Sequence, residues 1–357
     1  MITSLVPAQE LAERRAAYRA LTQRKLGILG LLVLLLVLSL IADMAIGPAR
    51  YALSDVVRAL LSPSQVDGSL LVVVWDIRLP VALMAVVVGA ALSVAGAQMQ
   101  TVLNNPLASP FTLGISAAAG FGASLALVLG VSLVPTLTSF VVPVNAFIMA
   151  VIASLLIHFL SQRKGVTTET IVLLGIALVF TFNALQAFLQ YLASEQALAA
   201  VVFWTMGSLG KATWGKLAVT TAVVALLLPF FARRAWLLTA LRLGDDKAQS
   251  LGVRIDRLRL ETLLAVSLLA AVPVAFVGTI GFIGLVGPHI ARLLIGEDQR
   301  FFLPASALTG ALMLSATSVV SKSIVPGVIF PIGVITALIG VPFFMALILT
   351  SRQRSWQ

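Results

Sequence analysis

Residues 278–296 read GTIGFIGLVGPHIARLLIG, and this stretch decides how the rest of the chain must fold. Four glycines recur at every third position from Gly278 to Gly287, and Pro288 and His289 follow at once. In water each glycine would weaken a helix. In a membrane, small residues let helix backbones approach closely, and this packing replaces much of the hydrophobic drive that operates in water. The stretch therefore predicts a short or broken helix inside a bundle of membrane helices.

The composition of the whole chain supports this prediction. The chain has 357 residues, of which 60% are hydrophobic and 11% are charged, and its mean hydropathy is +1.06. Soluble domains carry roughly 25% charged residues. Each membrane-spanning helix needs about 20 apolar residues, so this length accommodates roughly eight to ten spans with short loops. We therefore predict an all-α, polytopic membrane protein with no attached soluble domain.

Charge-free apolar runs predict about ten transmembrane helices. Nine of them cover residues 26–46, 80–100, 112–131, 140–160, 168–193, 217–232, 260–277, 303–321 and 331–350, and the eighth in chain order lies within 278–296. Pro273 and Gly278 divide the seventh span from the eighth, because no charged residue separates them. Residues 1–25 form a polar arm ahead of a single transmembrane domain, residues 26–351, whose first span is expected to be retained rather than cleaved as a signal peptide.

The distribution of basic residues orients the predicted spans. With ten spans both termini lie on one side of the membrane, and 18 of the 24 lysines and arginines fall on that side. Membrane proteins concentrate Lys and Arg in their cytoplasmic loops. Both termini are therefore expected in the cytoplasm. The net charge of +10 has the same explanation, so it indicates contact with membrane lipid and no nucleic-acid partner.

The sequence lacks the usual signs of an enzyme or a metal site. It has no cysteine, and its two histidines, His158 and His289, are far apart along the chain. Residues 207–213, GSLGKAT, lack the glycine spacing of a phosphate-binding loop and the hydroxyl residue that follows its lysine. Catalytic residues, metal ligands and a resident cofactor are therefore not expected, and the chain itself should bind no ATP.

Two other classes of transport protein remain as alternatives. Ion-coupled secondary transporters carry acidic residues within the membrane. Here the acidic residues nearest the spans, Asp43, Asp76 and Glu169, lie at span ends. A channel is disfavoured because the chain has no filter-like repeat and no ring-forming charged helix. The favoured reading is a pore-forming bundle that draws energy from a partner, and a secondary transporter is the alternative from a different class.

Residues 233–261 are the longest charged segment and lie on the predicted cytoplasmic side. They are too polar to span the membrane, and their pattern predicts two short helices separated near Gly244. Such a segment suits either the docking of a soluble partner or contact with lipid headgroups as an interfacial helix. Its central part, LRLGDDKAQSLG at 241–252, is too acidic for simple attraction to lipid. This composition favours the docking of a partner.

Six motifs follow one another along the chain. They are IRLP at 77–80, GAALSVAGAQMQ at 89–100, NPLASP at 105–110, LGDDKAQSLG at 243–252, GFIGLVGPHIARL at 281–293 and PIGVITALIG at 331–340. In this order they resemble the FecCD-type permease subunits of bacterial ATP-binding-cassette (ABC) importers of type II, which carry iron-siderophores, haem or cobalamin. The resemblance covers about residues 26–350. Each motif alone is weak, and the set is specific.

The resemblance implies a type II importer permease fold and a set of partners. It implies a permease homodimer or heterodimer with the pathway at the dimer interface, in the bacterial inner membrane. Two cytoplasmic ATP-binding subunits would use the ATP, and a periplasmic binding protein would deliver the cargo. The expected cargo is a ferric siderophore, the commonest in the family, with haem and cobalamin as alternatives. Val81 stands where the cobalamin permease has arginine.

The resemblance also implies roles for individual residues. Arg78 and Lys322, both on the predicted outer side, match basic positions that dock acidic residues of the binding protein. Exposed cations there would steer such a partner, and anchoring to lipid headgroups is the alternative for both. The coupling loop that fits into the ATPase matches Leu243, Gly244, Asp245, Asp246, Ala248, Leu251 and Gly252.

Two sets of polar residues match or suggest the gate and the pathway. Asn105 and the pair Thr167 and Thr168 match cytoplasmic gate positions of the family, although the threonines could instead cap the fifth span. The pathway candidates lie at helical spacing on that span, where they would line the path or bond to neighbouring helices. They are Asn183, Gln186 and Gln190.

The histidine and the arginine of the opening stretch complete the predictions. His289 belongs to a motif that the family shares whatever its cargo, so a structural hydrogen bond is expected rather than a haem ligand. Arg292 lies near the predicted cytoplasmic face and is also expected to be structural. His158 is expected at the membrane interface, at the cytoplasmic end of the fourth span.

Overall fold

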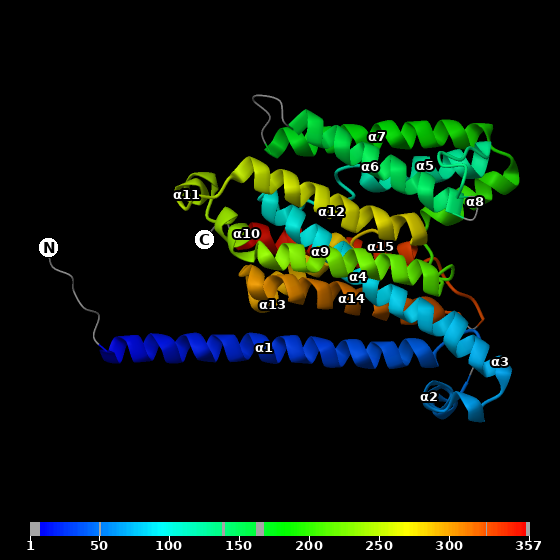
Figure 1. Ribbon diagram of the computed structural model, residues 1–357, viewed down its shortest axis with the longest axis horizontal. Coiled ribbons are helices and arrows are strands. Elements are labelled where there is room, and N and C mark those ends of the chain that lie inside the picture. Colours follow the sequence, from blue (N-terminus) through cyan, green and yellow to red (C-terminus); the bar gives the residue numbers. More distant parts are fainter. Residues whose placement is uncertain (1–7, 50, 138–139, 162–167, 326, 355–357) are drawn as a thin grey trace.

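The structure is a computed structural model that describes residues 8–49, 51–137, 140–161, 168–325 and 327–354. Within these residues the chain forms helices and no strands (Figure 1). In chain order the elements are α1 (Ala8–Ala45), α2 (Leu53–Leu61), the short 3-10 helix η1 (Pro63–Gln65), α3 (Gly68–Leu71), the π-helical η2 (Val72–Arg78), α4 (Leu79–Val102), α5 (Ile115–Leu129), α6 (Val141–Ser161), α7 (Thr168–Leu192), α8 (Glu195–Thr205), α9 (Trp214–Arg233), α10 (Ala235–Leu241), α11 (Asp245–Ser250), α12 (Ile255–Val277), α13 (Ile283–Ile295), α14 (Gln299–Ser323) and α15 (Ile332–Arg354).

Ten helical segments are apolar enough to lie in a membrane. Among the described residues, seven are long enough to cross it by length and composition: α1, the continuous helix from α3 to α4, and α6, α7, α9, α12 and α14. Three shorter apolar helices lie in α5, α13 and α15. These segments correspond to the ten predicted spans. The prediction of an all-α membrane protein with about ten transmembrane helices is confirmed.

Several predicted boundaries are wrong. The helix of the second span begins at Gly68 rather than near residue 80, because the charged side chains of Asp76 and Arg78 are accommodated on it. The helix of the seventh span begins at Ile255 rather than at residue 260. An additional helix, α8, lies between the fifth and sixth spans. The described part of the predicted N-terminal arm is helical and continuous with the first span, because α1 begins at Ala8.

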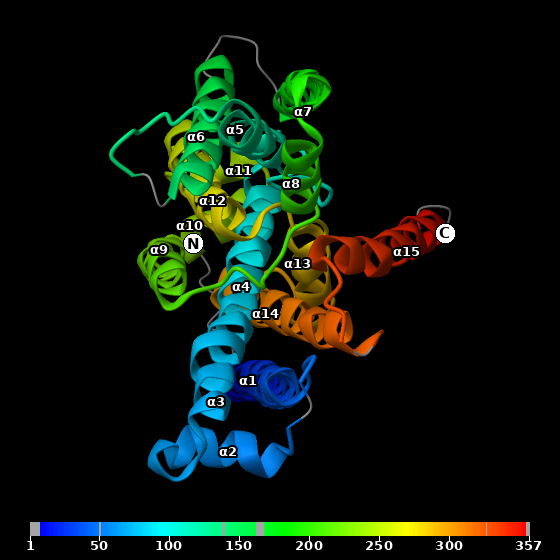
Figure 2. The ribbon, with the colours of Figure 1, turned by 90° about the vertical axis from the view of Figure 1, so that its right-hand side faces the viewer.

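The centre of the bundle is α4. Every residue from Ala91 to Leu103 is buried, and the helix contacts α9, α12, α13 and α14, which surround it in Figure 2. By contrast, α1 and α7 lie at opposite edges of the bundle (Figure 1). The C-terminal end of α4 is therefore packed firmly in the bundle, and the link that follows the helix begins there.

Small residues allow the helices around α4 to touch through their backbones. A Cβ atom on Gly96 would overlap the carbonyl oxygen of Gly284 on α13, and one on Gly89 would overlap the carbonyl oxygen of Gly310 on α14. Such close contact provides the packing that holds membrane helices together, since lipid chains are as apolar as the helices themselves.

The glycine-rich stretch forms the short helix α13 and the turn that precedes it. Gly278, with φ +75°, ends α12, as the sequence predicts. Phe282 also has a positive φ, of +66°, which is uncommon for a residue with a side chain and costs free energy. Its ring lies against Gly340 of α15, where a Cβ atom would clash with it. The turn is therefore held in place by packing against α15.

Candidate coupling site and gate

The charged segment forms two short helices, as predicted. The chain turns between α10 and α11 at Gly244, whose φ is +97°. Glycine adopts this backbone conformation more readily than any other residue. No atom lies within 4 Å of the position that a Cβ atom would take, so the turn requires glycine for its conformation and not for space. In Figure 1, α11 projects from the end of the bundle at which α1 begins.

One side of α11 is buried and the other is exposed. Ala248 is fully buried in the main hydrophobic core, which attaches the helix to the bundle. Leu243 and Leu251, just before and just after the helix, are 56% and 49% exposed. Asp246 and Gly252 are exposed as well. Exposed leucines on either side of a charged helix are available for contact with a partner protein.

Asp245 is bound within the chain. Both of its carboxylate oxygens accept hydrogen bonds from Nη2 of Arg259 on α12, at 2.9 and 3.0 Å. The Nε of the same arginine donates to the backbone carbonyl of Val102, at the end of α4, at 3.3 Å. One arginine therefore connects α11, the predicted coupling helix, to the central helix of the bundle.

A hollow of about 620 Å³ lies between the coupling loop and the link that follows α4. Asn105 and Pro106 of the link line it, together with Glu169 and Val172 of α7 and with Asp245. The structure thus brings the gate candidate Asn105 next to the predicted coupling loop and to the first turns of α7. These three segments are far apart in the sequence.

The second gate candidate lies at the start of α7. Thr168 is the first residue of that helix and precedes Glu169 of the hollow. Thr167 lies outside the residues that the structure describes. Asn105 accepts a hydrogen bond from the backbone N–H of Leu107 at 2.9 Å, which shapes the link locally. The gate role of these residues stays a prediction.

The pathway candidates on α7 differ in exposure. Gln186 is buried and lies against Gly120 of α5, whereas Gln190 is half-buried and Asn183 is exposed. Figure 2 shows α7 at the edge of the bundle. A path lined by Asn183 and Gln190 would therefore run along the surface of one chain and not through its interior.

The expectation that Arg78 is exposed is wrong. Its side chain lies in the bundle and the residue is 5% exposed. Its Nη1 donates to the carbonyl oxygens of Met44 and Ala45 at 2.7 and 3.1 Å, and its Nη2 donates to that of Ala49. Arg78 therefore satisfies the carbonyl groups at the end of α1 and ties that end to η2. It is not free to meet an acidic partner in this conformation.

Lys322 is buried in the same way. Its Nζ lies 2.9 Å from Oδ1 of Asp43, and the two side chains are 8% and 0% exposed. Hydropathy places both residues at span ends and does not show that they are paired. Because a buried cation without a partner is very unfavourable, the pair is part of the fold. The predicted role of Lys322 as an exposed docking cation is not supported by this position.

A network of charged and polar groups that the sequence does not predict lies at the end of the bundle from which α11 projects. Arg292 forms an ion pair with Glu297 at 3.0 Å and donates to Oε1 of Gln100 at 3.0 Å. Arg242 binds the same Glu297 and donates from Nη1 to Oδ1 of Asn104 at 3.2 Å. The network joins α4, α10 and α13. The sequence shows that charged residues lie at the ends of these helices, but it does not show which of them pair.

His289 contacts an aromatic ring. The ring centroids of His289 and Phe343 of α15 are 6.2 Å apart in a T-shaped arrangement. Among the residues that the structure describes, no three His, Asp or Glu side chains gather in a group that could hold a metal ion.

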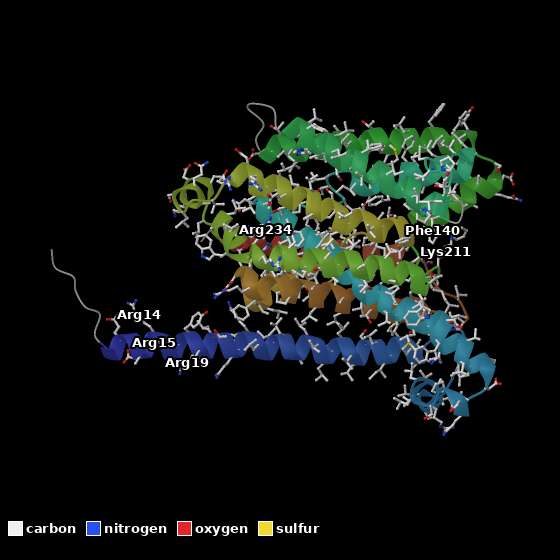
Figure 3. The ribbon with its side chains drawn as sticks, viewed as in Figure 1. Arg14, Arg15, Arg19, Phe140, Lys211 and Arg234 are labelled. Atoms are coloured by element: carbon white, nitrogen blue, oxygen red, sulfur yellow. The ribbon has the colours of Figure 1, made fainter. Side chains whose placement is uncertain are left out.

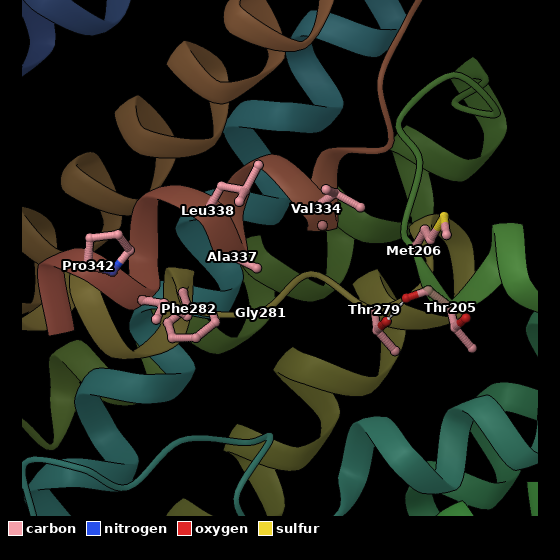
Figure 4. A pocket seen from close by; sticks show the side chains of 11 residues that line it. Thr205, Met206, Thr279, Gly281, Phe282, Val334, Ala337, Leu338 and Pro342 are labelled. Atoms are coloured by element: carbon pink, nitrogen blue, oxygen red, sulfur yellow. Dashed lines mark hydrogen bonds between the residues drawn. The ribbon is translucent and has the colours of Figure 1, made fainter. Parts of the chain in front are cut away.

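An apolar pocket of about 660 Å³ lies between the end of α8, the turn before α13 and the helix α15 (Figure 4). Met206, Thr279 and Phe282 line one side of it, and Val334 and Leu338 of α15 line the other. The hydroxyl of Thr279 donates to a backbone carbonyl of α8 and is therefore already bonded. No charged side chain lines this pocket, so it offers nothing that would bind a charged cargo.

Comparison with known proteins decides the family. Residues 32–350, nearly the whole chain, match the FecCD transport family. The chain belongs to the FecCD transport family. The resemblance inferred from the six sequence motifs is thereby confirmed.

Several relatives match along almost their full length. The archaeal protein MJ0087 of Methanocaldococcus jannaschii is 39% identical over 345 residues, which cover 94% of this chain and 98% of that protein. The hemin transport system permease protein HmuU of Yersinia pestis is 38% identical over 91% of this chain and 96% of its own length. The Fe(3+)-citrate import system permease protein YfmE of Bacillus subtilis is 37% identical over 90% and 94%. FecCD permeases thus occur in archaea as well as in bacteria.

A solved structure shares the fold. It is described as "An inward-facing conformation of a putative metal-chelate type ABC transporter" and is 31% identical to this chain, with a TM-score of 0.79. The match covers 91% of this chain and 99% of the other. This FecCD chain is therefore a multi-pass permease subunit of an ABC importer and is not itself catalytic. Such a permease works with ATPase and binding-protein partners, which sets aside the secondary transporter and the channel.

Proposed function

We propose that this FecCD permease carries a ferric siderophore across the inner membrane of a bacterial cell. A periplasmic binding protein delivers the cargo, and two cytoplasmic ATP-binding subunits provide the energy. The chain itself binds no ATP and holds no cofactor. The observation that carries the coupling part of the proposal is the shape of α11: a short helix that is anchored by buried Ala248 and flanked by exposed Leu243 and Leu251.

The positions of basic residues support an orientation with α11 and both termini in the cytoplasm. Arg14, Arg15, Arg19 and Arg234 lie at the end from which α11 projects, and Lys211 lies at the opposite end (Figure 3). Basic residues concentrate on the cytoplasmic side of membrane proteins. In this orientation the ATP-binding subunits meet α11, and the binding protein approaches the end that holds Lys211.

The surface of α7 supports a permease dimer, either of two copies or with a homologue. Asn183 is exposed there although α7 is a membrane-spanning helix. Phe180 and Tyr191 on the same helix are 71% and 86% exposed. An amide group that faces lipid lacks hydrogen-bond partners, which costs free energy. Water in a pathway between two permeases would provide those partners, and the second permease would shield the aromatic side chains from lipid.

The choice of cargo rests on the family. The relatives of this chain include proteins named for Fe(3+)-citrate, hemin and vitamin B12, so the cargo class is an iron chelate or a related large metal complex. A ferric siderophore is the commonest cargo in the family. Haem is the second candidate, because the hemin permease matches over 91% of this chain. Cobalamin is third, because Val81 replaces the arginine of the cobalamin permease.

The coupling role of α11 can be tested by replacing its exposed leucines. Leu243→Ser and Leu251→Ser should reduce the ATP hydrolysis of the reconstituted transporter about tenfold, since one exposed contact at the centre of an interface is worth about 1–2 kcal/mol. Leu61→Ser is the matched control, because Leu61 is 78% exposed on α2, far from α11. Full hydrolysis by both coupling variants would contradict the docking of ATPases on α11.

The cargo can be tested independently of coupling. Proteoliposomes that contain the complete transporter should take up a radiolabelled ferric siderophore only when ATP and the binding protein are present. Unlabelled ferric siderophore should compete with this uptake, and hemin and cobalamin should not. Competition by hemin alone would assign the chain to haem and reject the siderophore.

A further inference from the structure

We infer that Arg242 and Arg259 are positioning residues that fasten the coupling helix α11 to residues 102–105, the link that follows α4. Through them, a displacement of α11 moves this link and changes the opening at the cytoplasmic gate. The inference rests on the proposed function, in which α11 is the part moved by the ATP-binding subunits. Neither arginine belongs to the six motifs or to the residues to which the resemblance gives a role.

The two arginines flank α11 in the sequence, and both bind the link near the start of this helix. Arg242 precedes the helix, and its Nη1 donates to Oδ1 of Asn104 at 3.2 Å. Arg259 follows the helix on α12, and its Nε donates to the carbonyl of Val102 at 3.3 Å. Its Nη2 meanwhile binds both carboxylate oxygens of Asp245, the first residue of α11. The coupling helix and the link are therefore joined at two places.

Each guanidinium group binds both of its partners at once. Arg242 also forms an ion pair with Glu297, which in turn pairs with Arg292 of α13. The side chains of Arg242 and Arg259 are 19% and 24% exposed, so water competes only weakly for these bonds. The guanidinium is planar and presents donors in fixed directions, whereas the single ammonium of lysine cannot span two partners in this way.

The conformation of the link shows that it is held in place. Asn104 has φ +43°, one of two positive values found among non-glycine residues in the described part of the chain. Such a conformation costs free energy and persists where surrounding contacts enforce it. Leu103 is buried beside it, and Arg242 binds its side chain. The contact with Arg242 is therefore one of those that keep the link in this shape.

The link forms one wall of the hollow at the proposed gate. Asn105 and Pro106 line that hollow opposite Val172 and Leu173 of α7. Asp245 lies at the same hollow, next to the link. A shift of α11 that is carried to the link by the two arginines changes the distance between the link and α7. The width of the hollow is thus set by the position of the coupling helix.

The test separates transmission of movement from docking of the ATPase. Arg242→Lys and Arg259→Lys keep the positive charge and leave the exposed leucines beside α11 in place. In proteoliposomes with both partners, ATP hydrolysis should remain within about twofold of the wild type, whereas cargo uptake per ATP should fall about tenfold, the effect of losing one charge-assisted hydrogen bond. Arg300→Lys is the matched control. Arg300 also donates hydrogen bonds to an aspartate, Asp298, but it is 61% exposed and makes no hydrogen bond to the link.

A second variant acts from the other side of the contact. Asn104→Gly keeps the positive φ without strain and removes the oxygen that Arg242 binds. It should lower cargo uptake per ATP as Arg242→Lys does. The double variant of Asn104→Gly with Arg242→Lys should show no lower uptake per ATP than either single variant. Additive losses would show that the two residues act separately, which would overturn the inference for Arg242.

A distance measurement provides a readout besides transport. The chain has no cysteine, so Pro106→Cys and Leu173→Cys would introduce the only two thiols of this chain for spin labels. The distance between these labels should change when nucleotide binds to the complex, and this change should be lost in Arg259→Lys. An unchanged response in Arg259→Lys would overturn the inference for that residue. If instead the unsubstituted complex shows no nucleotide-driven uptake, the proposed function fails and not the inference alone.

Discussion

Lys322 of α14 and Asp43 of α1 form an ion pair inside the bundle, with 2.9 Å between Nζ and Oδ1. Neither side chain is more than 8% exposed. The second carboxylate oxygen of Asp43 is buried without a hydrogen-bond partner, so the lysine is the main group that compensates this charge. With Arg78, which binds carbonyl groups near the end of α1, the pair fixes one end of α1 to the helices beside it.

Removing one partner of this pair should destabilise the protein strongly. Lys322→Met leaves the buried carboxylate of Asp43 without a counter-charge, and such a change costs about 3–5 kcal/mol. The double variant Asp43→Leu with Lys322→Met should be much closer to the wild type, because it buries no charge. Unfolding in detergent, followed by the loss of helical circular dichroism with denaturant, measures both. If Lys322→Met unfolds like the wild type and only loses affinity for the binding protein, Lys322 acts in docking and not in the fold.

Gly96→Ala should destabilise the contact between α4 and α13. Its Cβ atom would overlap the carbonyl oxygen of Gly284, so the two helices must move apart. Overpacking of this kind costs about 1–3 kcal/mol or more. Gly27→Ala on α1 is the control, because no atom lies within 4 Å of its Cβ position. The melting temperatures of both variants in detergent measure these effects, and Gly27→Ala should leave the melting temperature unchanged or raise it slightly. Equal changes in melting temperature at both sites would refute the close helix contact.

The contact between Phe282 and Gly340 predicts a coupled pair of substitutions. Gly340→Ala would place a methyl group against the ring of Phe282, 2.8 Å from its Cδ1 atom, and should cost about 1–3 kcal/mol. In a Phe282→Gly background the ring is absent and the strained backbone is relaxed, so the same methyl group should cost less than about 1 kcal/mol. Unfolding of the four proteins of this double-mutant cycle gives the coupling. If the changes in the free energy of unfolding are strictly additive, the ring of Phe282 does not pack on Gly340.

Asp298 predicts a dependence of stability on pH in the acid range. A hydrogen bond from the side chain of Arg300 lowers the pKa of the Asp298 carboxyl below its ordinary value. A carboxyl whose pKa is lower in the folded state stabilises the protein fully above the unfolded pKa of about 3.9. This contribution is lost as the pH falls through the folded pKa. The difference in melting temperature between the wild type and Asp298→Asn should therefore be constant near neutral pH and shrink below about pH 4. A difference that stays constant down to pH 3 would exclude the ionised hydrogen bond as its source.

Much of the fold follows from local sequence. Apolar runs predicted the ten membrane segments, and Gly278 predicted the end of α12, because span length and backbone conformation depend on neighbouring residues. The two short helices on either side of Gly244 follow for the same reason. The sequence does not predict the helix α8, because its apolar run, residues 197–204, is too short to span a membrane.

The sequence by itself determined the class of protein, the order and number of the membrane helices, the two short helices of the charged segment and, through its motifs, the family. These depend on composition and on spacing along the chain. Only the tertiary structure decided which charges are free. Lys322 pairs with a residue 279 positions away, and Arg242 binds a side chain 138 positions away. Contacts between residues so distant in sequence exist only after the helices pack. The burial of Lys322 and the hydrogen bonds from Arg242 and Arg259 to the link after α4 are therefore properties of the folded bundle.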